Sequence, residues 1–388
     1  MSSPKHIFLV AGEASGDLHA SHLAEELRTL NPSLSFSGVG GPLMQKAGVE
    51  LYEDLTKIAV VGFVEVLKHF LEFRRVFHLV LDKIRTAKPD AVILVDYPGF
   101  NLRLAKELKK LGIKVIYYIS PQVWAWKENR VEAIRRDVDK MLVLFEFEKE
   151  FYAKRGLDVE FVGHPLIDSI KVTKPKKQFL ESVGLSDNTL TVGLLPGSRR
   201  KEIENLLPAM LEAADILNRE FNGKIQFLLL KAPNIAMDFV ARYLRSNIVS
   251  NLRVVTLPLT IIDGQTYDGI NASDVCMVAS GTATLETAII GKPMVVAYKT
   301  SLLTYWLAKN LVKISNIALV NVVAQKRIVA ECVQFDATGV KLAAEVRNIL
   351  TNEAGIAKIK SDLAAVKESL GGSGASKRAA EAVLKILS

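Results

Sequence analysis

Polar residues that could do chemistry stand in loops that directly follow apolar runs. The first such loop is AGEASGDLHAS at residues 11–21, where Gly12 and Gly16 allow a tight turn. Ser15 or Asp17 could cap the next helix, whose N-terminus would favour an anion or a polar substrate group. The loop lacks the G-x-G-x-x-G pattern, which excludes the dinucleotide-binding fingerprint. An ordinary capped turn is the alternative interpretation.

The second loop, VDYPGFN at residues 95–101, starts where a very apolar run ends at Asp96. A carboxylate at the rim of a ligand cleft is partly desolvated, so its pKa can rise toward the range of a general base. Asp96 is therefore the first candidate for a catalytic base. The alternative is a cap for the helix that starts near Phe100, although Asn101 or the turn itself could serve that end.

The third loop, ISPQVWAWKENR at residues 119–130, carries Trp124 and Trp126 one residue apart. Aromatic rings at the edge of a cleft stack on sugar faces or meet acyl chains. The two tryptophans could equally plug the loop onto their own domain.

The fourth loop, LLPGSRRKEIE at residues 194–204, runs from a strand through Pro-Gly-Ser-Arg-Arg into a helix. Backbone N–H groups at the helix start, together with Arg199 or Arg200, would bind a phosphate. The Walker pattern is missing, so this is not a P-loop.

The fifth loop lies in VASGTATLETAIIGKPMVVAY at residues 278–298, where Ser280 and Thr282 flank the start of a helix. Glu286 lies four residues beyond Thr282, on the same helix face. A helix N-terminus for a diphosphate and a carboxylate for a ribose diol would form a nucleotide site. The alternative is a capped helix with a solvated glutamate.

The apolar runs that precede these loops predict the elements that position them. Most are continuous rather than alternating, which favours strands buried on both faces, and helical stretches of about 10–20 residues separate them. This alternation predicts parallel sheets covered by helices, an α/β fold. The predicted strands are residues 6–12, 91–96, 114–119, 140–145, 190–197, 225–230, 253–257, 275–279 and 293–298.

The chain divides best at the Lys/Pro-rich segment 172–177, after which the strand-helix pattern restarts. We expect two doubly wound, Rossmann-like domains at 1–171 and 178–370, facing a central cleft. Residues 371–388 should form a C-terminal helix that packs back on an N-terminal domain. Ligands of such sheets bind beyond the carboxyl ends of the strands, where the five loops lie.

Composition limits the classes of function. The 388 residues are 49% apolar and 24% charged, with a net charge of +8, which is a globular composition. Two cysteines, Cys276 and Cys332, exclude a disulfide scaffold and a Cys-based zinc site, so a reducing cytosol is the default compartment. The N-terminus is a poor signal peptide, and no run of about 18 uncharged apolar residues occurs.

The same composition is basic and apolar, with a pI of about 9.2 and a mean hydropathy of +0.21. These values suggest a membrane surface or a nucleic acid as partner. No helix-turn-helix, RNA-binding aromatic motif or basic tail supports nucleic acid. Residues 60–88 instead predict a basic amphipathic helix that could dip into an anionic bilayer or hold acyl chains. A core helix is the alternative. The aromatic face of the predicted helix carries Phe63, Phe70, Phe73 and Phe77.

Metal and nucleophile motifs are mostly absent. The six histidines show no H-E-x-x-H, and only His19 stands in a candidate loop. Asp137 and Asp139 resemble a D-x-D metal motif but precede a predicted strand, so we interpret them as a solvated turn. G-x-S-x-G is absent, which argues against a hydrolase. We expect no metal and no cofactor.

Taken together, the motifs resemble those of the lipid-A-disaccharide synthase family from residue 6 to 387. The matching segments are AGEASGDLHAS, VGFVEVL, VDYPGFN, SPQVWAWKENR, FVGHPLID, LLPGSRRKEIE, SGTATLE and GGSGASKRAAEAVL. The resemblance implies a GT-B glycosyltransferase of Gram-negative bacteria at the inner face of the cytoplasmic membrane. Such an enzyme joins UDP-2,3-diacylglucosamine to 2,3-diacylglucosamine 1-phosphate (lipid X), giving a β-1,6-linked disaccharide 1-phosphate and UDP. It also leaves room for a homodimer.

The resemblance and the loop chemistry together assign roles. Asp96 is the first choice for general base, with Asp17 or His19 in reserve, and Arg199 neutralises the departing diphosphate. The residues expected to bind the UDP-sugar are Gly197, Ser198, Arg199, Ser280, Gly281, Thr282, Thr284, Glu286, Asn316 and Asn321. Those expected on the acceptor or lipid side are Gly12, Glu13, Ser15, Gly16, Phe63, Phe70, Phe73, Trp124 and Trp126.

The sequence departs from the family's pattern at two positions, and two alternative functions are considered. Val61 replaces a usual Met of the family, and Val320 stands where Pro is usual, which leaves the backbone around Asn316 and Asn321 uncertain. A peptidoglycan-precursor glycosyltransferase or a UDP-sugar epimerase would share the C-terminal nucleotide loops but would not need the apolar 60–80 region. A non-enzymatic, nucleotide-binding membrane scaffold would need neither Asp96 nor Arg199.

Overall fold

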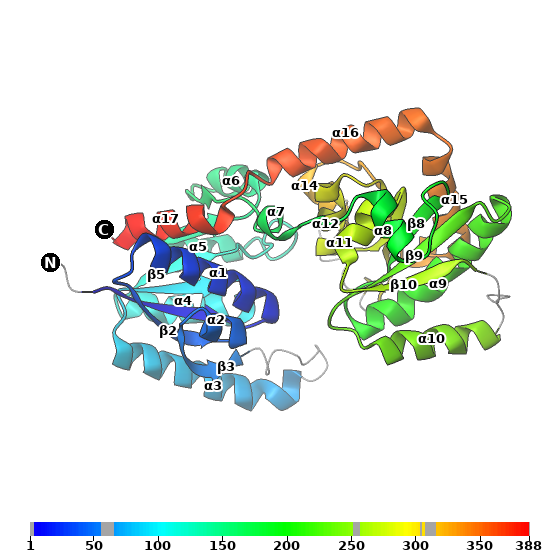
Figure 1. The fold of residues 1–388 in the computed structure, drawn as a ribbon. Helices are drawn as coiled ribbons and strands as arrows, with labels where there is room; N and C mark the ends of the chain where they lie inside the picture. Colours follow the sequence, from blue (N-terminus) through cyan, green and yellow to red (C-terminus); the bar gives the residue numbers. More distant parts are fainter. Residues whose placement is uncertain (1–3, 56–65, 251–256, 303–304, 307–315, 388) are drawn as a thin grey trace. The chain divides into compact units, whose positions relative to one another are not determined.

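A computed structural model describes residues 4–55, 66–250, 257–302, 305–306 and 316–387, of which 66–72, 243 and 245–250 are described as backbone only. The chain forms two compact units, each with its own parallel sheet (Figure 1). Unit 1 comprises Met1–Asp168 together with Leu370–Ser388, and unit 2 comprises Ser169–Ser369. The predicted α/β class with two doubly wound domains is confirmed.

Unit 1 contains a seven-stranded sheet in the order β3-β2-β1-β4-β5-β6-β7. The chain order reverses between β1 and β4, which makes this the switch point at which such sheets bind ligands. The strands are β1 His6–Ala11, β2 Ser35–Gly40, β3 Glu50–Asp54, β4 Ala91–Val95, β5 Lys114–Tyr118, β6 Lys140–Val143 and β7 Glu160–Phe161. The helices are α1 Ala14–Leu30, α2 Pro42–Lys46, α3 Val66–Ala87, α4 Pro98–Lys110, α5 Arg130–Asp137, α6 Glu146–Ala153, α7 Leu166–Ser169 and α17 Ala375–Leu387.

The C-terminal helix α17 returns to unit 1 and packs along α1 (Figure 1). Polar bonds hold its start in place. The Asp168 carboxylate accepts from the Gly374 backbone N–H at 2.9 Å, and Arg378 Nε donates to the Val162 carbonyl at 2.8 Å. The two ends of the chain therefore complete one unit.

Unit 2 contains a six-stranded sheet in the order β10-β9-β8-β11-β12-β13, with its own switch point between β8 and β11. The strands are β8 Leu190–Leu195, β9 Ile225–Lys231, β10 Leu259–Asp263, β11 Val275–Ala279, β12 Met294–Tyr298 and β13 Ala330–Val333. The α-helices are α8 Lys176–Ser182, α9 Arg200–Glu220, α10 Met237–Ser250, α11 Thr266–Ala272, α12 Thr282–Ile290, α14 Leu319–Val323, α15 Gly339–Leu350 and α16 Glu353–Ser369, and η3 Gln334–Asp336 is a 3₁₀ turn.

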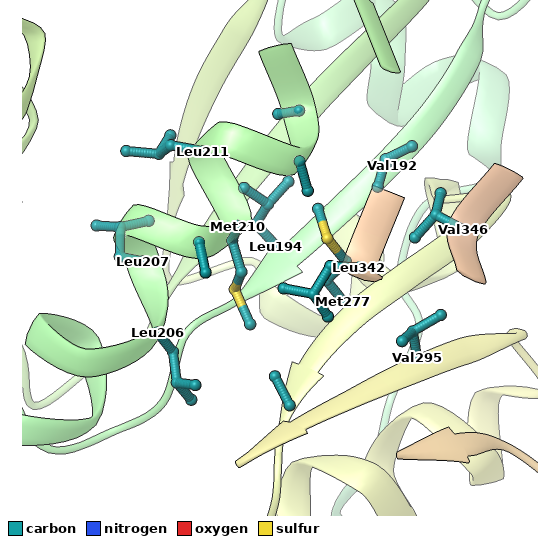
Figure 2. Close-up of a cluster of buried hydrophobic side chains, with 14 of the residues drawn as sticks. Val192, Leu194, Leu206, Leu207, Met210, Leu211, Met277, Val295, Leu342 and Val346 are labelled. Carbon is teal, nitrogen blue, oxygen red and sulfur yellow. The ribbon is translucent and has the colours of Figure 1, made fainter. Parts of the chain in front are cut away.

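The core of unit 2 shows why continuous apolar runs become buried strands. Side chains of α9, including Leu207 and Met210, face β8 and the neighbouring strands (Figure 2). Leu342 and Val346 of α15 pack into the same cluster. Helices thus remove this face of the sheet from water. Burial of apolar surface stabilises the fold by roughly 25 cal/mol per Å².

Most predicted strands are confirmed within one or two residues, but several differences matter. The predicted strand 253–257 falls on residues 251–256, which lie outside the described part of the chain, and on Leu257, which is not in a strand; the strand β10, which follows, was not predicted. The strands β2, β3, β7 and β13 were not predicted. Those segments are short, polar or glycine-containing, so they lack the apolar run that marks a central strand.

Glycine explains why β2 carries a weak strand signal. A Cβ placed on Gly38 would lie 2.2 Å from the Leu9 carbonyl oxygen of the neighbouring strand. Only glycine lets β1 and β2 approach this closely, although it weakens the local strand propensity.

The predicted linker 172–177 lies within unit 2 rather than hanging free. The Asp268 carboxylate accepts from the Thr173 backbone N–H at 2.6 Å and from the Lys174 N–H at 3.0 Å. Lys176, the first residue of α8, forms an ion pair with Asp274 at 2.5 Å. The segment is therefore anchored to α11 and to the start of β11.

The predicted helix of residues 60–88 corresponds to α3 (Val66–Ala87) over the described part of the chain, and residues 60–65 lie outside it. Arg75, His78, Asp82 and Arg85 of α3 are exposed and Val80 is buried, as expected of an amphipathic helix. No helix among the described residues is long and apolar enough to cross a membrane.

Gly38→Ala should destabilise unit 1, because the added methyl group collides with backbone and forces the sheet apart. We expect the free energy of unfolding to fall by about 1–3 kcal/mol, measured by urea denaturation of the full chain. Gly99→Ala is the matched control, since nothing in the part of the chain that the structure describes lies within 4 Å of its Cβ position. Equal stability of the two variants would contradict the close approach of β1 and β2.

Candidate active site

The candidate site of unit 1 lies at the switch point between β1 and β4. The loop after β1 contributes Gly12 and Glu13, and the loop after β4 contributes Asp96 and Tyr97. The two loops are in contact, because a Cβ on Gly12 would lie 2.2 Å from the Tyr97 ring. Gly12 is therefore required so that the aromatic ring can pack on the first loop.

The backbone at Asp96 is unusual, since Asp96 and Tyr97 both adopt the left-handed conformation, with φ of 47° and 46°. Each such residue costs about 1–2 kcal/mol. Two side chains hold this turn: the Tyr117 hydroxyl donates to the Asp96 carbonyl at 2.6 Å, and Asn101 Nδ2 donates to the same oxygen at 2.8 Å. Tyr117 and Asn101 are thus positioning residues for Asp96.

This geometry decides against the alternative in which the Asp96 side chain caps α4. The N-cap is Tyr97, with Pro98 as the first helical residue, and neither Asp96 nor Asn101 caps the helix through its side chain. Asn101 is fully buried and also donates to the Val95 carbonyl at 3.2 Å. The left-handed turn leaves the Asp96 carboxylate without a capping role.

Burial, together with the negative charge of Glu13, raises the pKa of Asp96 to about 6, against a backbone hydrogen bond from Tyr97 that lowers it. A carboxyl group with such a pKa is ionised at neutral pH yet binds a proton readily. That combination suits a general base.

Asp17, a reserve candidate for the base, has a structural role. Its carboxylate is 2% exposed and accepts from the backbone N–H groups of Gly41, Leu43 and Met44 at 2.9–3.0 Å. Asp17 thus caps α2, not its own helix, and Glu13 rather than Ser15 is the N-cap residue of α1. The expected cap of α1 by Ser15 or Asp17 is wrong, because α1 starts earlier than predicted.

His19, the other reserve candidate, is partly buried in α1. Its Nδ1 is buried without a hydrogen-bond partner in the described part of the chain. Burial lowers the pKa of His19 to about 4, and His22 adds to this effect. At equal access to substrate it is a weaker base than Asp96.

Other acceptor-side candidates of the first loop differ in exposure. Glu13 and Ser15 are exposed, whereas Gly16 is buried, where its Cβ position lies 3.5 Å from the Ala11 side chain. Glu13 and Ser15 can therefore meet a ligand with their side chains, and Gly16 serves packing.

The two tryptophans of the third loop have different environments: Trp124 packs on its own unit, and Trp126 is available to a ligand. Trp124 donates to the buried Glu148 carboxylate at 3.3 Å and packs edge-on against Phe147, so it plugs the loop onto its own unit. Trp126 is 39% exposed, with Lys127 Nζ 4.4 Å and Arg130 Cζ 5.5 Å from the ring centroid. This cationic aromatic surface is available to a ligand.

The lipid-side phenylalanines are only partly described. Phe63 lies outside the described residues, as does the side chain of Phe70. Phe73 is half-buried and packs edge-on against Phe100 at a centroid distance of 5.2 Å. Its contact with the core agrees with the core-helix alternative for this part of α3.

In unit 2 the two candidate loops follow β8 and β11, which are neighbours at the switch point. Gly197 has a φ of 118°, and its Cβ position lies 2.5 Å from the Glu202 carboxylate. That carboxylate accepts from the backbone N–H groups of Ser198 and Arg199 at 3.0 and 3.2 Å. These two amides are therefore occupied by Glu202, and an incoming diphosphate would have to displace it.

Arg199 itself is directed to solvent. Its side chain is 81% exposed and forms an ion pair with Glu202 at 2.9 Å. An exposed guanidinium held at a helix start can turn toward an anion at little cost.

The second loop of unit 2 offers an open helix start. Gly281 is the N-cap of α12 with a φ of 150°, and no atom of the described residues lies within 4 Å of its Cβ position. Ser280 donates through Oγ to the Ile317 carbonyl at 3.1 Å, while Thr282 is exposed. Backbone amides at this helix start favour a phosphate group.

Glu286 lies on the same helix and is half-buried. Burial raises the pKa of Glu286, and its charge adds to the burial that raises the pKa of Tyr267 to about 12. A partly desolvated carboxylate beside an aromatic residue suits a hydroxyl-bearing ligand.

Thr284 and Asn321 belong to the scaffold that supports this loop. Both are fully buried. Asn321 accepts from the N–H groups of Ile328 and Val329, and donates to the Val329 carbonyl at 3.0 Å and to Glu331 at 2.8 Å. Its amide group therefore has no capacity left for a ligand. Their expected contact with a UDP-sugar is therefore replaced by a positioning role.

Val320 makes a bond that a proline could not make. Its backbone N–H donates to Thr284 Oγ1 at 3.3 Å, which links α14 to α12. This hydrogen bond of Val320 therefore holds the backbone next to Asn321 in place where the family usually has a proline. Asn316, four residues earlier, is half-buried.

No group of three or more histidine, cysteine, aspartate or glutamate side chains that could hold a metal ion is found within the described ranges. A cavity of about 600 Å³ beside α9 is lined by residues such as Asn205, Glu212 and Lys299, and it includes none of the predicted site residues.

Comparisons with known proteins agree with the fold of the two units. Solved structures with the same fold include the UDP-GlcNAc 2-epimerase of Neisseria meningitidis bound to UDP-GlcNAc, at 13% identity and a TM-score of 0.63, covering 98% of this chain and all of that one. Acinetobacter baumannii MurG matches at 14% identity and a TM-score of 0.58, with the same coverage. The fold is thus that of two-domain α/β proteins of the GT-B type.

Sequence similarity then identifies the family. The family described as lipid-A-disaccharide synthetase matches residues 7–386. The lipid-A-disaccharide synthase of Geobacter metallireducens is 44% identical, covering 99% of this chain and 97% of the relative. Lipid-A-disaccharide synthase 1 of Legionella pneumophila (strain Philadelphia 1) is 42% identical, with 96% and 95% covered. The chain belongs to the lipid-A-disaccharide synthase family.

Replacing Asp17 tests its structural role. Asp17→Ala should lower the free energy of unfolding by about 2–4 kcal/mol, because two buried backbone N–H groups and one partly buried N–H group lose a charged acceptor. Asp90→Ala is the control: Asp90 accepts one exposed backbone bond, from His6, and should cost about 1 kcal/mol or less. Urea denaturation of both variants measures the difference. A loss no larger for Asp17 than for Asp90 would contradict this role.

Proposed function

We propose that this chain transfers the sugar of UDP-2,3-diacylglucosamine to 2,3-diacylglucosamine 1-phosphate, giving a β-1,6-linked disaccharide 1-phosphate and UDP. Its membership of the lipid-A-disaccharide synthase family over residues 7–386 carries this proposal. The carboxylate pair of Asp96 and Glu13 at the switch point of unit 1 supports it, because sugar transfer needs a base for the acceptor hydroxyl.

The proposed chemistry is a single displacement. Asp96 takes the proton of the acceptor 6-hydroxyl, and the freed oxygen attacks the anomeric carbon of the donor sugar. The bond between that carbon and the diphosphate oxygen breaks, and UDP leaves with the bonding electrons. Glu13 raises the pKa of Asp96, so the base holds the abstracted proton more firmly.

Unit 2 would bind the UDP portion. Arg199 and the helix start at Ser280 to Thr282 would neutralise charge that develops on the leaving diphosphate. Glu286 would accept hydrogen bonds from the ribose hydroxyls, and Asn316 would line the same side. This assignment predicts catalysis without a metal ion.

The acyl chains of the proposed substrates suggest that the enzyme works at a membrane. Trp126, with its neighbouring cations, and the 60–77 region would contact acyl chains or an anionic membrane, at the inner face of the cytoplasmic membrane of a Gram-negative cell. A homodimer remains a further expectation. A peptidoglycan-precursor glycosyltransferase or a UDP-sugar epimerase shares the fold, and a nucleotide-binding scaffold is the non-enzymatic alternative.

Product formation from both lipid substrates in detergent micelles tests the proposal. Asp96→Ala should lower kcat by about 10²–10⁴-fold, because the acceptor hydroxyl loses its base. EDTA should leave the wild-type rate unchanged. Asp90→Ala, at the other end of β4, is the control and should keep wild-type activity. Absence of disaccharide from folded wild type would overturn the assignment, and an active Asp96→Ala variant would overturn the mechanism.

The pH dependence of kcat/KM tests the electrostatics. Only ionised Asp96 can accept a proton, so the rate should rise with pH up to about 6 and then level off. Glu13→Gln removes a negative charge that raises the pKa of Asp96, so the acidic limb should move to lower pH. Glu25→Gln, on an exposed position of α1, should leave the limb in place. An acidic limb that stays at the same pH, or moves to higher pH, in Glu13→Gln would contradict the coupling between Glu13 and Asp96.

A further inference from the structure

The segment between β5 and α5 presents a large aromatic ring to solvent between two cations. Trp126 is 39% exposed, and its ring centroid lies 4.4 Å from Lys127 Nζ and 5.5 Å from Arg130 Cζ. Tryptophan is highly buried in most proteins, and contacts between cations and an exposed ring are weak. These contacts alone therefore do not explain the exposed ring. We call Trp126, Lys127 and Arg130 the cationic tryptophan cluster.

The two positive charges of this cluster are not neutralised by the acids that lie beside them in the sequence. The Glu128 carboxylate accepts from Arg155 Nε at 2.9 Å, and Glu132 forms an ion pair with Arg135 at 3.4 Å. Within the described ranges, neither cation of the cluster forms an ion pair. Both charges are therefore available to an anion from outside the chain.

Buried contacts fix the loop that carries the cluster. Trp124 donates to the Glu148 carboxylate at 3.3 Å, and the hydroxyl groups of Ser120 and Tyr152 share a hydrogen bond of 2.7 Å. Ala125, directly before the exposed ring, is 5% exposed. The cluster is thus a built surface and not the tip of a loose loop.

The backbone of this loop is strained at both ends. Ile119 at its start and Lys127 near its end adopt positive φ angles of 69° and 56°. For a β-branched residue such as isoleucine this conformation is a genuine outlier, and such strain is concentrated at ligand sites. The Arg130 N–H donates to the Lys127 carbonyl at 2.9 Å, so the two cations share one turn.

The loop starts beside the turn that carries Asp96. The Asp96 N–H donates to the Tyr118 carbonyl at 3.0 Å, and Tyr118 pairs with Val95 between β5 and β4. The Tyr117 hydroxyl, which holds the Asp96 carbonyl, is also within reach of Arg130. Burial raises the pKa of Tyr117 well above its ordinary value, and the positive charge of Arg130 opposes this rise. The cluster therefore borders the candidate site of unit 1.

We propose that Lys127 and Arg130 bind the phosphate group of a sugar-phosphate acceptor whose sugar ring packs on Trp126. A phosphate monoester carries a charge of about −1.5 to −2 at pH 7. Arginine binds phosphate through two parallel hydrogen bonds, and lysine binds it as a point charge. Aromatic rings pack on the apolar faces of sugars.

This inference rests on the proposed function, in which the acceptor is a sugar 1-phosphate. It narrows the contact proposed there for Trp126 and its neighbouring cations to the phosphorylated head of that acceptor. Asp96 would then take the proton of the acceptor hydroxyl while the next loop holds the phosphate. The cluster would select a phosphorylated acceptor over the same sugar without phosphate.

Calorimetric titration of the full chain in micelles of an uncharged detergent tests this selection. The two ligands are 2,3-diacylglucosamine 1-phosphate and 2,3-diacylglucosamine. Wild type should bind the phosphorylated lipid at least about tenfold more tightly. The combined variant Lys127→Gln, Arg130→Gln should lose about tenfold or more of its affinity for the phosphorylated lipid only, because the charge-assisted hydrogen bonds to phosphate are lost.

Three further variants separate the roles within the cluster. Trp126→Ala should weaken binding of both lipids by the same factor, because the ring contacts the sugar and not the phosphate. Arg130→Lys keeps the charge and should retain part of the preference. Lys83→Gln is the matched control: Lys83 Nζ lies 4.8 Å from the ring centroid of Tyr52 in β3, on the other side of the switch point, so the variant should bind both lipids like wild type.

Four results would overturn the proposal. They are equal affinity of wild type for the two lipids, absence of binding to either, an unchanged preference in the combined variant, and equal weakening of both lipids in that variant. If the combined variant does not keep the wild-type unfolding midpoint, Lys127→Gln alone replaces it, with a smaller loss of preference expected.

Two additional measurements distinguish this proposal from its neighbours. The combined variant is sedimented with phosphatidylglycerol vesicles: weaker sedimentation with an unchanged lipid preference would assign the cations to a phospholipid headgroup and overturn the acceptor subsite. Donor is then added to the micelles. A wild type that prefers the phosphorylated lipid but forms no disaccharide would overturn the proposed function alone and leave the phosphate site standing.

Discussion

The left-handed backbone at Asp96 and Tyr97 is the constraint on which the site of unit 1 depends. It turns the chain out of β4 at the edge of the sheet and leaves the Asp96 carboxylate free of any capping role. The turn persists because Tyr117 and Asn101 donate to the Asp96 carbonyl, and because Gly12 leaves room for the Tyr97 ring. Local strain of this kind is retained where the surrounding structure over-determines it.

Two buried aspartates illustrate opposite uses of the same side chain. The Asp17 carboxylate accepts hydrogen bonds from three backbone N–H groups and thereby joins α1 to α2. Asp96 accepts a backbone hydrogen bond from Tyr97, but burial and the charge of Glu13 outweigh this bond and raise the pKa of Asp96 to about 6. Because the folded chain binds this proton more tightly than the unfolded chain, stability due to Asp96 falls as pH rises from its ordinary pKa through about 6. Reactivity is gained here at the expense of stability.

Unit 2 positions its loops through carboxylates and amides that contact backbone rather than ligand. Glu202 holds the loop after β8, and Glu331 accepts from the N–H groups of Ile317 and Ala318 at 3.0 Å. Asn321 joins Glu331 to the turn before β13. These contacts leave the start of α12 open at Gly281 and the side chain of Arg199 exposed. The scaffold thereby separates residues that shape the site from residues that can reach a ligand.

The sequence by itself determined the α/β class, the two sheets, and the five loops, because buried parallel strands need continuous apolar runs and their ligands lie beyond the strand ends. It did not reveal β2 or β13, whose short segments are stabilised by neighbouring strands rather than by their own apolarity. Motif membership placed Asp17, Thr284 and Asn321 among the site residues, yet only the tertiary structure showed that their polar atoms are used by backbone groups distant in sequence. The same holds for Asn101 and Tyr117 at Asp96, because hydrogen-bond partners are decided by packing in three dimensions and not by spacing along the chain.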